Sequence, residues 1–323
     1  MKTINIMTSC DGNLIKFIPI QLKAIADNLS DRKINFYLFH DGSKSDEVSD
    51  LKAIEYKNIT FHDVVIEDIQ PYESIAKRGG DWCGAAYYSL CAHQYLPADM
   101  DRILYIDAGD VLIVDNIDKY YFADFDGKSL IATSIACKSE GGKPSFFTRD
   151  DLFDKPCLER IARGIFNSGS YVINLNKMRK IRYTLKDYTN WTELIYESTG
   201  KPNQAFFGDQ GFLSLVFVGD IKFFNRSQNI DLFYMPYNFG LWYFDKCPRK
   251  LDYEPAIIHF IGDNIFKPWK GEYPLFLKGI QSAAELHDFT DLKPEQIEYY
   301  DLWYKYSLAA KRQELDRGMS YEG

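Results

Sequence analysis

In the stretch Ile103-Leu-Tyr-Ile-Asp-Ala-Gly-Asp-Val-Leu-Ile-Val114, two acids interrupt an otherwise apolar run. The segment Ile103–Ile106 is apolar and partly β-branched, which is typical of a buried strand. Asp107 and Asp110 follow it, separated by two small residues, and the apolar run then resumes. Like charges held this close repel each other in a poorly solvated place, so we expect something to neutralise them.

Two interpretations of this acidic pair are open at this point. Hard oxygen ligands at the end of a strand suit Mn²⁺ or Mg²⁺, and a cation held there would in turn hold a diphosphate. Asp and Gly are also common in surface turns, which need no ion. Further ligands elsewhere in the chain are needed to favour the cation.

Composition narrows the class of protein. The chain has 323 residues, of which 46% are hydrophobic and 16% aromatic, enough apolar material for one large domain or two modest ones. The net charge of −8 argues against nucleic acid or an anionic membrane as the main partner. A negatively charged small substrate would need a local metal or basic clamp.

The sequence also bears on location. The segment Met1–Met7 carries one charge and a very short apolar run, unlike a signal peptide. Nothing approaches the roughly 20 apolar residues of a membrane-spanning helix. The six cysteines show no C-x-x-C spacing, which is typical of reduced thiols. We therefore expect a cytoplasmic protein without a transmembrane segment.

Strand and helix patterns alternate in the first half. We expect strands over 4–7, 34–39, 59–65 and 103–106, and helices over 15–29, 46–56 and 84–96. Strands joined by a helix through short links run parallel, so this half is predicted to be a doubly wound α/β sheet. Ligands of such sheets bind beyond the carboxyl ends of the strands, where Asp11, Asn13 and the Asp107/Asp110 pair all fall.

The second half is less regular. We expect strands over 130–133, 166–175 and 256–261, a helix over 209–217, and a polar loop over 138–154 that acts as a lid. His259 lies on the last of these strands, where it is either a hydrogen-bonded core histidine or a metal ligand.

The tail over 294–315 is predicted to be a helix with Pro294 in its first turn. Its apolar stripe would consist of Ile297, Tyr300, Tyr304 and Leu308. Its charges nearly balance, so we expect it to pack on its own domain rather than on a membrane.

Four segments resemble, in this order, the motifs of family 8 glycosyltransferases, the retaining nucleotide-sugar enzymes of the GT-A type. They are Thr8-Ser-Cys-Asp-Gly-Asn13, Tyr105-Ile-Asp-Ala-Gly-Asp110, Phe166-Asn-Ser-Gly-Ser-Tyr-Val-Ile-Asn-Leu-Asn-Lys-Met178 and His259-Phe-Ile-Gly-Asp-Asn-Ile-Phe-Lys-Pro-Trp269. Asp209-Gln210 is a fifth, shorter match. The resemblance covers about residues 4 to 270, and the ordered set is more specific than any single motif.

The resemblance implies a donor and metal site. Asp107, Asp110 and His259 would bind Mn²⁺ or Mg²⁺, and imidazole with two carboxylates suits Mn²⁺. The uracil and ribose of a UDP-sugar would be bound by Asp11, Asn13 and the adjoining Thr8. Its diphosphate would be bound by Lys267, with the Gly262 backbone close by.

The resemblance also implies catalytic residues. Asn167 and Asp209 would hold hydroxyls of the donor sugar, and Gln210 would lie near the anomeric carbon. Gln210 is a poor nucleophile, which favours attack by the acceptor from the leaving-group face over a covalent intermediate. Residues of these types also serve as ordinary caps and turns, so their joint occurrence carries the interpretation.

Four positions depart from the family pattern. The acidic motif has two residues between its carboxylates, where the family usually has one. Leu14 stands where an aromatic residue often stacks on uracil, and Ser89 stands where a donor-binding arginine is common. Ala136 replaces an acid that some members use near the acceptor.

The resulting prediction is a GT-A fold, a Rossmann-like, mostly parallel α/β sheet over 1–275, with a helical extension over 276–323 packed on it. The predicted activity is metal-dependent, retaining transfer of glucose or galactose from a UDP-sugar to a glycan or glycolipid acceptor such as lipopolysaccharide or capsule. Peripheral membrane contact is compatible with such an acceptor. A catalytically silent nucleotide-sugar-binding protein of the same fold is the alternative. A nucleotidyltransferase is disfavoured because no Gly-rich basic loop is seen near the N-terminus.

Overall fold

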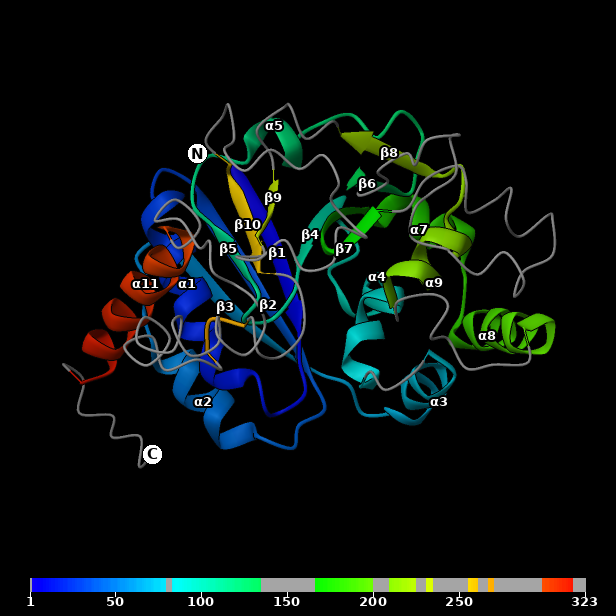
Figure 1. Ribbon diagram of the computed structural model, residues 1–323, viewed down its shortest axis with the longest axis horizontal. Coiled ribbons are helices and arrows are strands. Elements are labelled where there is room, and N and C mark those ends of the chain that lie inside the picture. The colour runs from blue at the N-terminus through cyan, green and yellow to red at the C-terminus, as the bar shows by residue number, and fades with distance from the viewer. Residues whose placement is uncertain are drawn as a thin grey trace, which may run out of the picture.

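The computed structural model describes residues 2–79, 83–134, 166–199, 209–224, 231–234, 255–260, 267–269 and 298–315 (Figure 1). In the first part of the chain the elements are β1 (Thr3–Ser9), a 3-10 turn η1 (Ile15–Phe17), α1 (Ile18–Asn28), β2 (Lys33–His40), α2 (Ser45–Ala53), β3 (Ile59–Val65), α3 (Gln70–Gly79), a 3-10 segment η2 (Gly84–Cys91), α4 (Ala92–Tyr95), β4 (Arg102–Ile106), β5 (Val111–Ile113) and α5 (Asp118–Tyr121).

The later elements are β6 (Leu130–Ser134), β7 (Phe166–Asn174), α7 (Leu175–Ile181), α8 (Leu185–Thr199), α9 (Asp209–Val216), β8 (Ile221–Phe224), β9 (Asp231–Tyr234), β10 (Ile257–Phe260) and α11 (Glu298–Leu315). All the strands expected from the sequence are present, to within a few residues at their ends.

Seven strands form the main sheet, in the order β3-β2-β1-β4-β7-β6-β8. The pairs β1/β2, β2/β3, β1/β4 and β6/β8 are parallel, whereas β7 is antiparallel to both of its neighbours. The predicted doubly wound, mostly parallel sheet is thus confirmed. Strand order steps outward from β1 in both directions, so the carboxyl ends of β1 and β4 are neighbours at the point where ligands of such sheets bind.

A second, three-stranded sheet has the order β5-β10-β9. Strand β10 is antiparallel to β5 and parallel to β9. In this register His259 lies opposite Val111, and the Phe260 N–H donates to the Asp110 carbonyl at 2.9 Å. The small sheet therefore fastens a late segment of the chain to the acidic loop that follows β4.

The core lies in layers on the two faces of the main sheet. One buried cluster includes Tyr72, Tyr105, Tyr171 and Phe212, and the other includes Phe36, Leu104 and Val172, so alternate residues of the central strands supply opposite faces. A third cluster joins α1 to α11, which lie side by side in Figure 1.

Two helix predictions were wrong in detail. The segment over 84–96 is not one α-helix but a 3-10 segment followed by the short α4. Almost every residue of the 3-10 segment is buried, so it has no single apolar stripe of the kind that an amphipathic α-helix shows.

In α11 the packed face consists of Trp303, Tyr306 and Ala310, whereas Leu308 of the predicted stripe is 61% exposed. Tyr304 of the predicted stripe does pack against the third cluster, so the stripe was right at Tyr304 and wrong at Leu308. The expected docking of a terminal helix is nonetheless observed, while the domain boundary at 275 stays a prediction.

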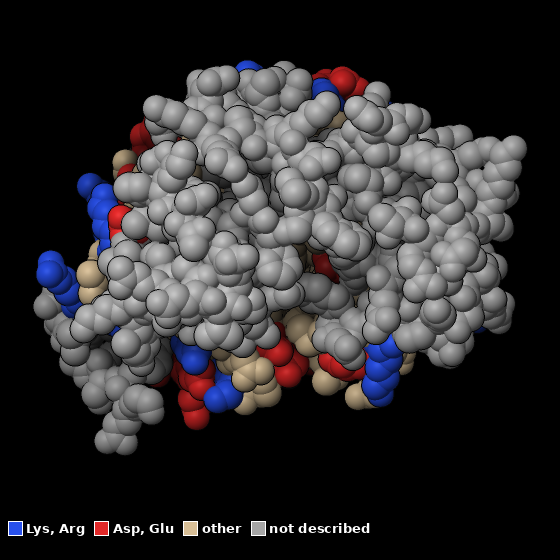
Figure 2. Space-filling model, in the orientation of Figure 1, with Lys and Arg blue, Asp and Glu red and all other residues tan. Residues whose placement is uncertain are grey.

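Other expectations concern charge, membranes and thiols. Basic side chains lie beside acidic ones along the lower edge of the face in Figure 2, so charges of both signs are interleaved there. Within the described ranges, no helix is long and apolar enough to cross a bilayer. Cys10, Cys83 and Cys91 are free thiols. The loop predicted over 138–154 lies outside the described residues.

Candidate active site

The acidic loop connects β4 to β5 and carries Asp107 and Asp110 at its two ends. Gly109 in this loop has a φ of +76°, a left-handed conformation that L side chains rarely adopt. Gln21 of α1 spans the loop, because its Nε2 donates to the carbonyls of Asp107 and Val111, each at 2.8 Å. Both acids are therefore held on a fixed backbone.

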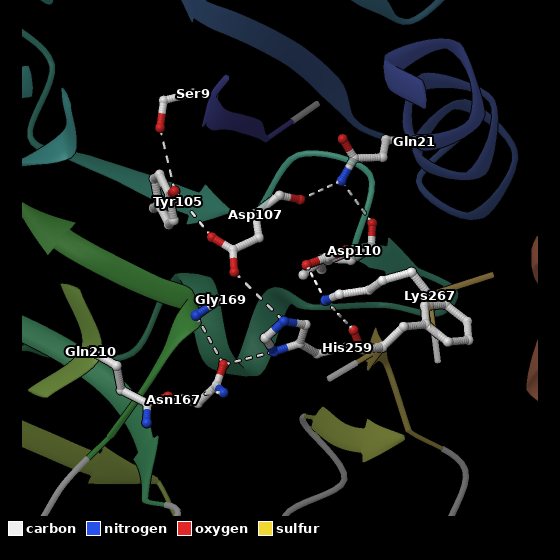
Figure 3. Close-up of polar contacts among 12 residues, drawn as sticks. Ser9, Gln21, Tyr105, Asp107, Asp110, Asn167, Gly169, Gln210, His259 and Lys267 are labelled. Carbon is white, nitrogen blue, oxygen red and sulfur yellow. Dashed lines mark hydrogen bonds and ion pairs between the residues drawn. The ribbon is translucent and has the colours of Figure 1, made fainter. Parts of the chain in front are cut away.

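His259 of β10 approaches the same loop (Figure 3). Its Nε2 lies 3.5 Å from Asp107 Oδ2. One ligand atom from each of Asp107, Asp110 and His259 lies within 4.8 Å of the others. The structure thus brings the three predicted metal ligands together, although Asp110 and His259 are 149 positions apart in the sequence.

The tautomer of His259 follows from its other neighbours. Asn167 Oδ1 accepts the Gly169 N–H at 2.9 Å, which identifies this atom as the amide oxygen. The same oxygen lies 2.8 Å from His259 Nδ1, which must then carry the proton and donate it. Burial and the nearby Lys267 charge lower the pKa of His259 well below its usual value, so the ring is neutral. Its Nε2 lone pair consequently points towards a carboxylate.

Gly169 makes room for this histidine. A Cβ at position 169 would lie 2.1 Å from His259 Cε1 and 2.5 Å from Nδ1. The imidazole therefore lies directly against the β7 backbone, and only glycine is accommodated there without displacing it.

Lys267 reaches the loop from the segment before Pro268. Its Nζ lies 2.5 Å from Asp110 Oδ2 and donates to the Phe260 carbonyl at 2.8 Å. The other oxygen of Asp110 is buried and has no hydrogen-bond partner. Burial raises the pKa of Asp110, and the Lys267 charge opposes that rise.

Asp107 is the most strongly perturbed carboxyl in the cluster. Burial, followed by the charges of Asp209 and Asp110, raises its pKa well above the ordinary value, whereas Lys267 and a hydrogen bond from Tyr105 lower it. The Tyr105 hydroxyl donates to Asp107 Oδ1 at 3.0 Å, so Oδ2 is the oxygen that faces His259. A cluster of acids that resists ionisation is the electrostatic condition that a bound cation relieves.

The predicted catalytic residues adjoin the histidine. Asn167 Nδ2 donates to Gln210 Oε1 at 3.3 Å. Asp209 is the first residue of α9 and is 7% exposed. Burial raises its pKa to about 6, against hydrogen bonds from Ser168 and from backbone N–H groups at the helix start. Hydrogen bonds thus connect His259 to Asn167 and Asn167 to Gln210.

The predicted nucleoside-binding residues lie at the end of β1. Thr8 is fully buried and its Oγ1 has no partner. Asp11 accepts the Asn13 backbone N–H at 3.1 Å and lies 3.4 Å from its amide nitrogen, so both residues take part in a local turn. The strand before them pairs with β4, while the hydrogen bonds of Asp11 and Asn13 in the described structure stay within their own turn. Gly262 lies outside the described residues.

The departures from the family pattern have structural counterparts. Leu14 is partly buried and packs against the second core cluster. Ser89 is 3% exposed and its Oγ accepts the Tyr171 hydroxyl at 2.7 Å, so this position offers no charge to a ligand. Ala136 lies outside the described residues.

Three residues next to the cluster were given no role from the sequence: Tyr105, Gln21 and Gly169. Gln21 interrupts the buried face of α1 between Ile20 and Leu22, and an isolated amide on such a face is a signal that it bonds to backbone. The other two lie within recognised motifs, but nothing in their residue types indicates which neighbour they would touch.

The chain is similar to known proteins over most of its length. Residues 5–272 match the model of glycosyl transferase family 8. The chain is 23% identical over 270 residues to lipopolysaccharide 1,2-glucosyltransferase of Escherichia coli, covering 83% of this chain and 74% of that protein. It is 24% identical over 288 residues to lipopolysaccharide 1,3-galactosyltransferase of Salmonella typhimurium, covering 87% and 77%.

The fold resembles that of LgtC. A crystal structure of an active-site mutant of LgtC superposes with a TM-score of 0.63 at 19% identity, covering 95% of this chain and 96% of that one. The galactosyltransferase LgtC in complex with donor and acceptor sugar analogues gives 0.58 at 20% identity, covering 92% and 100%. This likeness shows a GT-A-type fold, and together with the match over most of its length it shows that the chain belongs to glycosyl transferase family 8.

Proposed function

We propose that the protein is a cation-dependent, retaining hexosyltransferase that moves glucose or galactose from a UDP-sugar to a cell-surface glycan such as lipopolysaccharide or capsule. Family membership supports sugar transfer. The names of the glucosyl- and galactosyltransferase relatives support a hexose and a lipopolysaccharide-type acceptor.

One observation is the main support for a cation at this site. The neutral His259 directs its Nε2 lone pair at Asp107 Oδ2 from 3.5 Å, so two potential ligand atoms face each other at a separation that a cation bound to both would satisfy. Asp110 Oδ1 is a buried carboxylate oxygen of the same cluster and has no hydrogen-bond partner. Two carboxylates and an imidazole fit Mn²⁺ well and Mg²⁺ less well. Asn167 would fix the imidazole from behind, as residues next to metal-bound histidines do.

Charge at the diphosphate is the second part of the proposal. When bound, a divalent cation stabilises the negative charge that develops on the departing diphosphate. Lys267 would supply a further positive charge at the same point, since its ammonium already lies beside Asp110. The Gly262 backbone would approach the same diphosphate. At the nucleoside end, Thr8, Asp11 and Asn13 would bind ribose and uracil.

Asn167, Asp209 and Gln210 would orient the donor hexose. The Gln210 carboxamide hydrogen bonds to Asn167 and is a weak nucleophile, which supports attack by the acceptor from the leaving-group face. In that route the proton of the acceptor hydroxyl passes to the departing phosphate oxygen, so no basic side chain is required of the protein.

The test is hydrolysis or transfer of UDP-glucose and UDP-galactose with Mn²⁺, before and after chelation. Asp107→Asn should lose the activity. Asp99→Asn is a matched control, because Asp99 is exposed and lies just before the opposite end of the same strand. Activity that survives both chelation and Asp107→Asn would refute the cation-dependent function.

A second candidate is a nucleotide-sugar-binding protein without turnover. The observation that favours it is the buried Ser89–Tyr171 pair, which occupies a position where the family commonly has a donor-binding arginine. Calorimetry that detects UDP binding in Mn²⁺, with no product from a panel of donors and acceptors, would favour this candidate over the enzyme.

A further inference from the structure

Helix α11 touches the acidic loop directly. The Trp303 indole Nε1–H donates to the Gly109 carbonyl at 3.4 Å, and this side chain is 3% exposed. Gly109 belongs to the two-residue spacer between Asp107 and Asp110 and has the left-handed conformation. A residue nearly two hundred positions later in the chain thus bonds to the peptide that sets the distance between the two acids.

Aromatic rings enclose the same peptide. A Cβ on Gly109 would lie 3.2 Å from Phe17 Cβ and 3.5 Å from Trp269 Cη2. The ring centroids of Phe17 and Trp269 are 4.7 Å apart, and each lies 6.2 Å from that of Trp303. The loop is therefore packed against rings from η1, from the segment after Lys267 and from α11.

The next residue of α11 holds the lysine segment. The Tyr304 hydroxyl donates to the Pro268 carbonyl, immediately after Lys267. The helix itself is anchored farther along, where Asn28 of α1 donates to the Tyr306 hydroxyl at 2.7 Å. Consecutive residues of one helix thus contact the two backbone segments that carry Asp110 and Lys267.

We propose that α11 positions the cation site, with Trp303 and Tyr304 as positioning residues that fix the Gly109 peptide and the Lys267–Trp269 segment relative to each other. Ligand atoms have to stay within about 0.2 Å of their ideal distances from a metal, so a loosened loop holds a cation less well. The effect on cation affinity rests on the proposed function, whereas the effect on the loop does not.

The test uses Trp303→Phe and Tyr304→Phe, with Tyr306→Phe as the matched control. Tyr304→Phe removes a single oxygen, which keeps the test usable if the smaller ring at 303 disturbs folding. Tyr306→Phe also removes one hydroxyl from the same helix, but its partner is Asn28 rather than either site segment. Amide hydrogen exchange is followed over residues 107–114 and 267–269 without metal, and Mn²⁺ binding is measured by calorimetry.

We expect exchange in residues 107–114 to become at least about threefold faster in Trp303→Phe, since one hydrogen bond is lost. In Tyr304→Phe the increase should fall on residues 267–269. The Mn²⁺ dissociation constant should rise about tenfold in both variants and stay unchanged in the control. Local exchange equal to that of the control overturns the proposal. Faster local exchange in a protein that binds no Mn²⁺ supports the positioning role and refutes the proposed cation instead.

Discussion

Replacing Gly169 by alanine tests the packing on which His259 depends. The added Cβ would lie 2.1 Å from His259 Cε1, whereas ordinary contact begins near 3.4 Å. The ring has to retreat by about 1.3 Å, the difference between these distances, and β7 is buried on both sides and cannot easily move. A displacement of that size exceeds the roughly 0.2 Å that a metal ligand tolerates.

Two results are expected for Gly169→Ala. Overpacking of this kind lowers the free energy of unfolding by about 1–3 kcal/mol, which urea unfolding measures. The Mn²⁺ affinity should fall by at least about tenfold, because His259 no longer reaches its place. Calorimetry with Mn²⁺ measures this second effect.

A double-mutant cycle isolates the cause. In a His259→Ala background the clash is gone, so Gly169→Ala should cost almost nothing in stability. An equal cost in both backgrounds would show that the alanine meets something other than the imidazole. Wild-type Mn²⁺ affinity in Gly169→Ala would refute the assignment of His259 as a ligand.

Three further predictions concern charge. Lys267→Met leaves the Asp110 carboxylate without its ion pair, so urea unfolding in the presence of a chelator should show a free energy of unfolding lower by about 3 kcal/mol. Added Mn²⁺ should restore part of this loss. A variant as stable as the wild type would contradict the ion pair. The pKa of Asp209 is raised to about 6 in the folded state, so between pH 4 and pH 6 the folded protein binds more protons than the unfolded chain. The free energy of unfolding should therefore fall by up to about 3 kcal/mol as the pH rises from 4 to 6. Asp209→Asn should flatten that slope in a pH series of unfolding curves, and an unchanged slope would assign it to another group. Tyr105→Phe removes the hydrogen bond that directs Asp107, so its Mn²⁺ dissociation constant should rise about tenfold by calorimetry while its far-UV circular dichroism stays the same.

The sheet was largely predictable because strands and helices leave different periodicities in the sequence. Parallel pairing of the first strands followed from their short connections, and so did the placement of Asp11 and Asp107 just beyond the carboxyl ends of two neighbouring strands. The antiparallel β7 was not foreseen, since a strand pattern does not encode direction. The membership of β10 in a separate small sheet was equally invisible, because it depends on pairing with β5.

The sequence was sufficient to predict the types of the candidate metal ligands but not the residues that hold those ligands in place. Carboxylates beside an apolar strand and a distant histidine indicate a cation by their chemistry. The neighbours that orient them, such as Gln21 and Trp303, are ordinary helix residues, and their roles depend on how α1 and α11 pack against the loop between the two sheets. Periodicity correctly placed Tyr304 of α11 against the protein and wrongly placed Leu308 there, because the pattern alone does not show that Trp303, Tyr306 and Ala310 form the buried face.

The order in which the chain is synthesised gives the small sheet a further consequence. During synthesis both acids leave the ribosome well before His259, and Trp303 and Tyr304 of α11 follow later still. A nascent chain that already has its first parallel strands therefore still lacks one of the three proposed ligands. If the proposed site binds a cation, a product that ends before His259 would contain all seven strands of the main sheet but bind the ion only weakly.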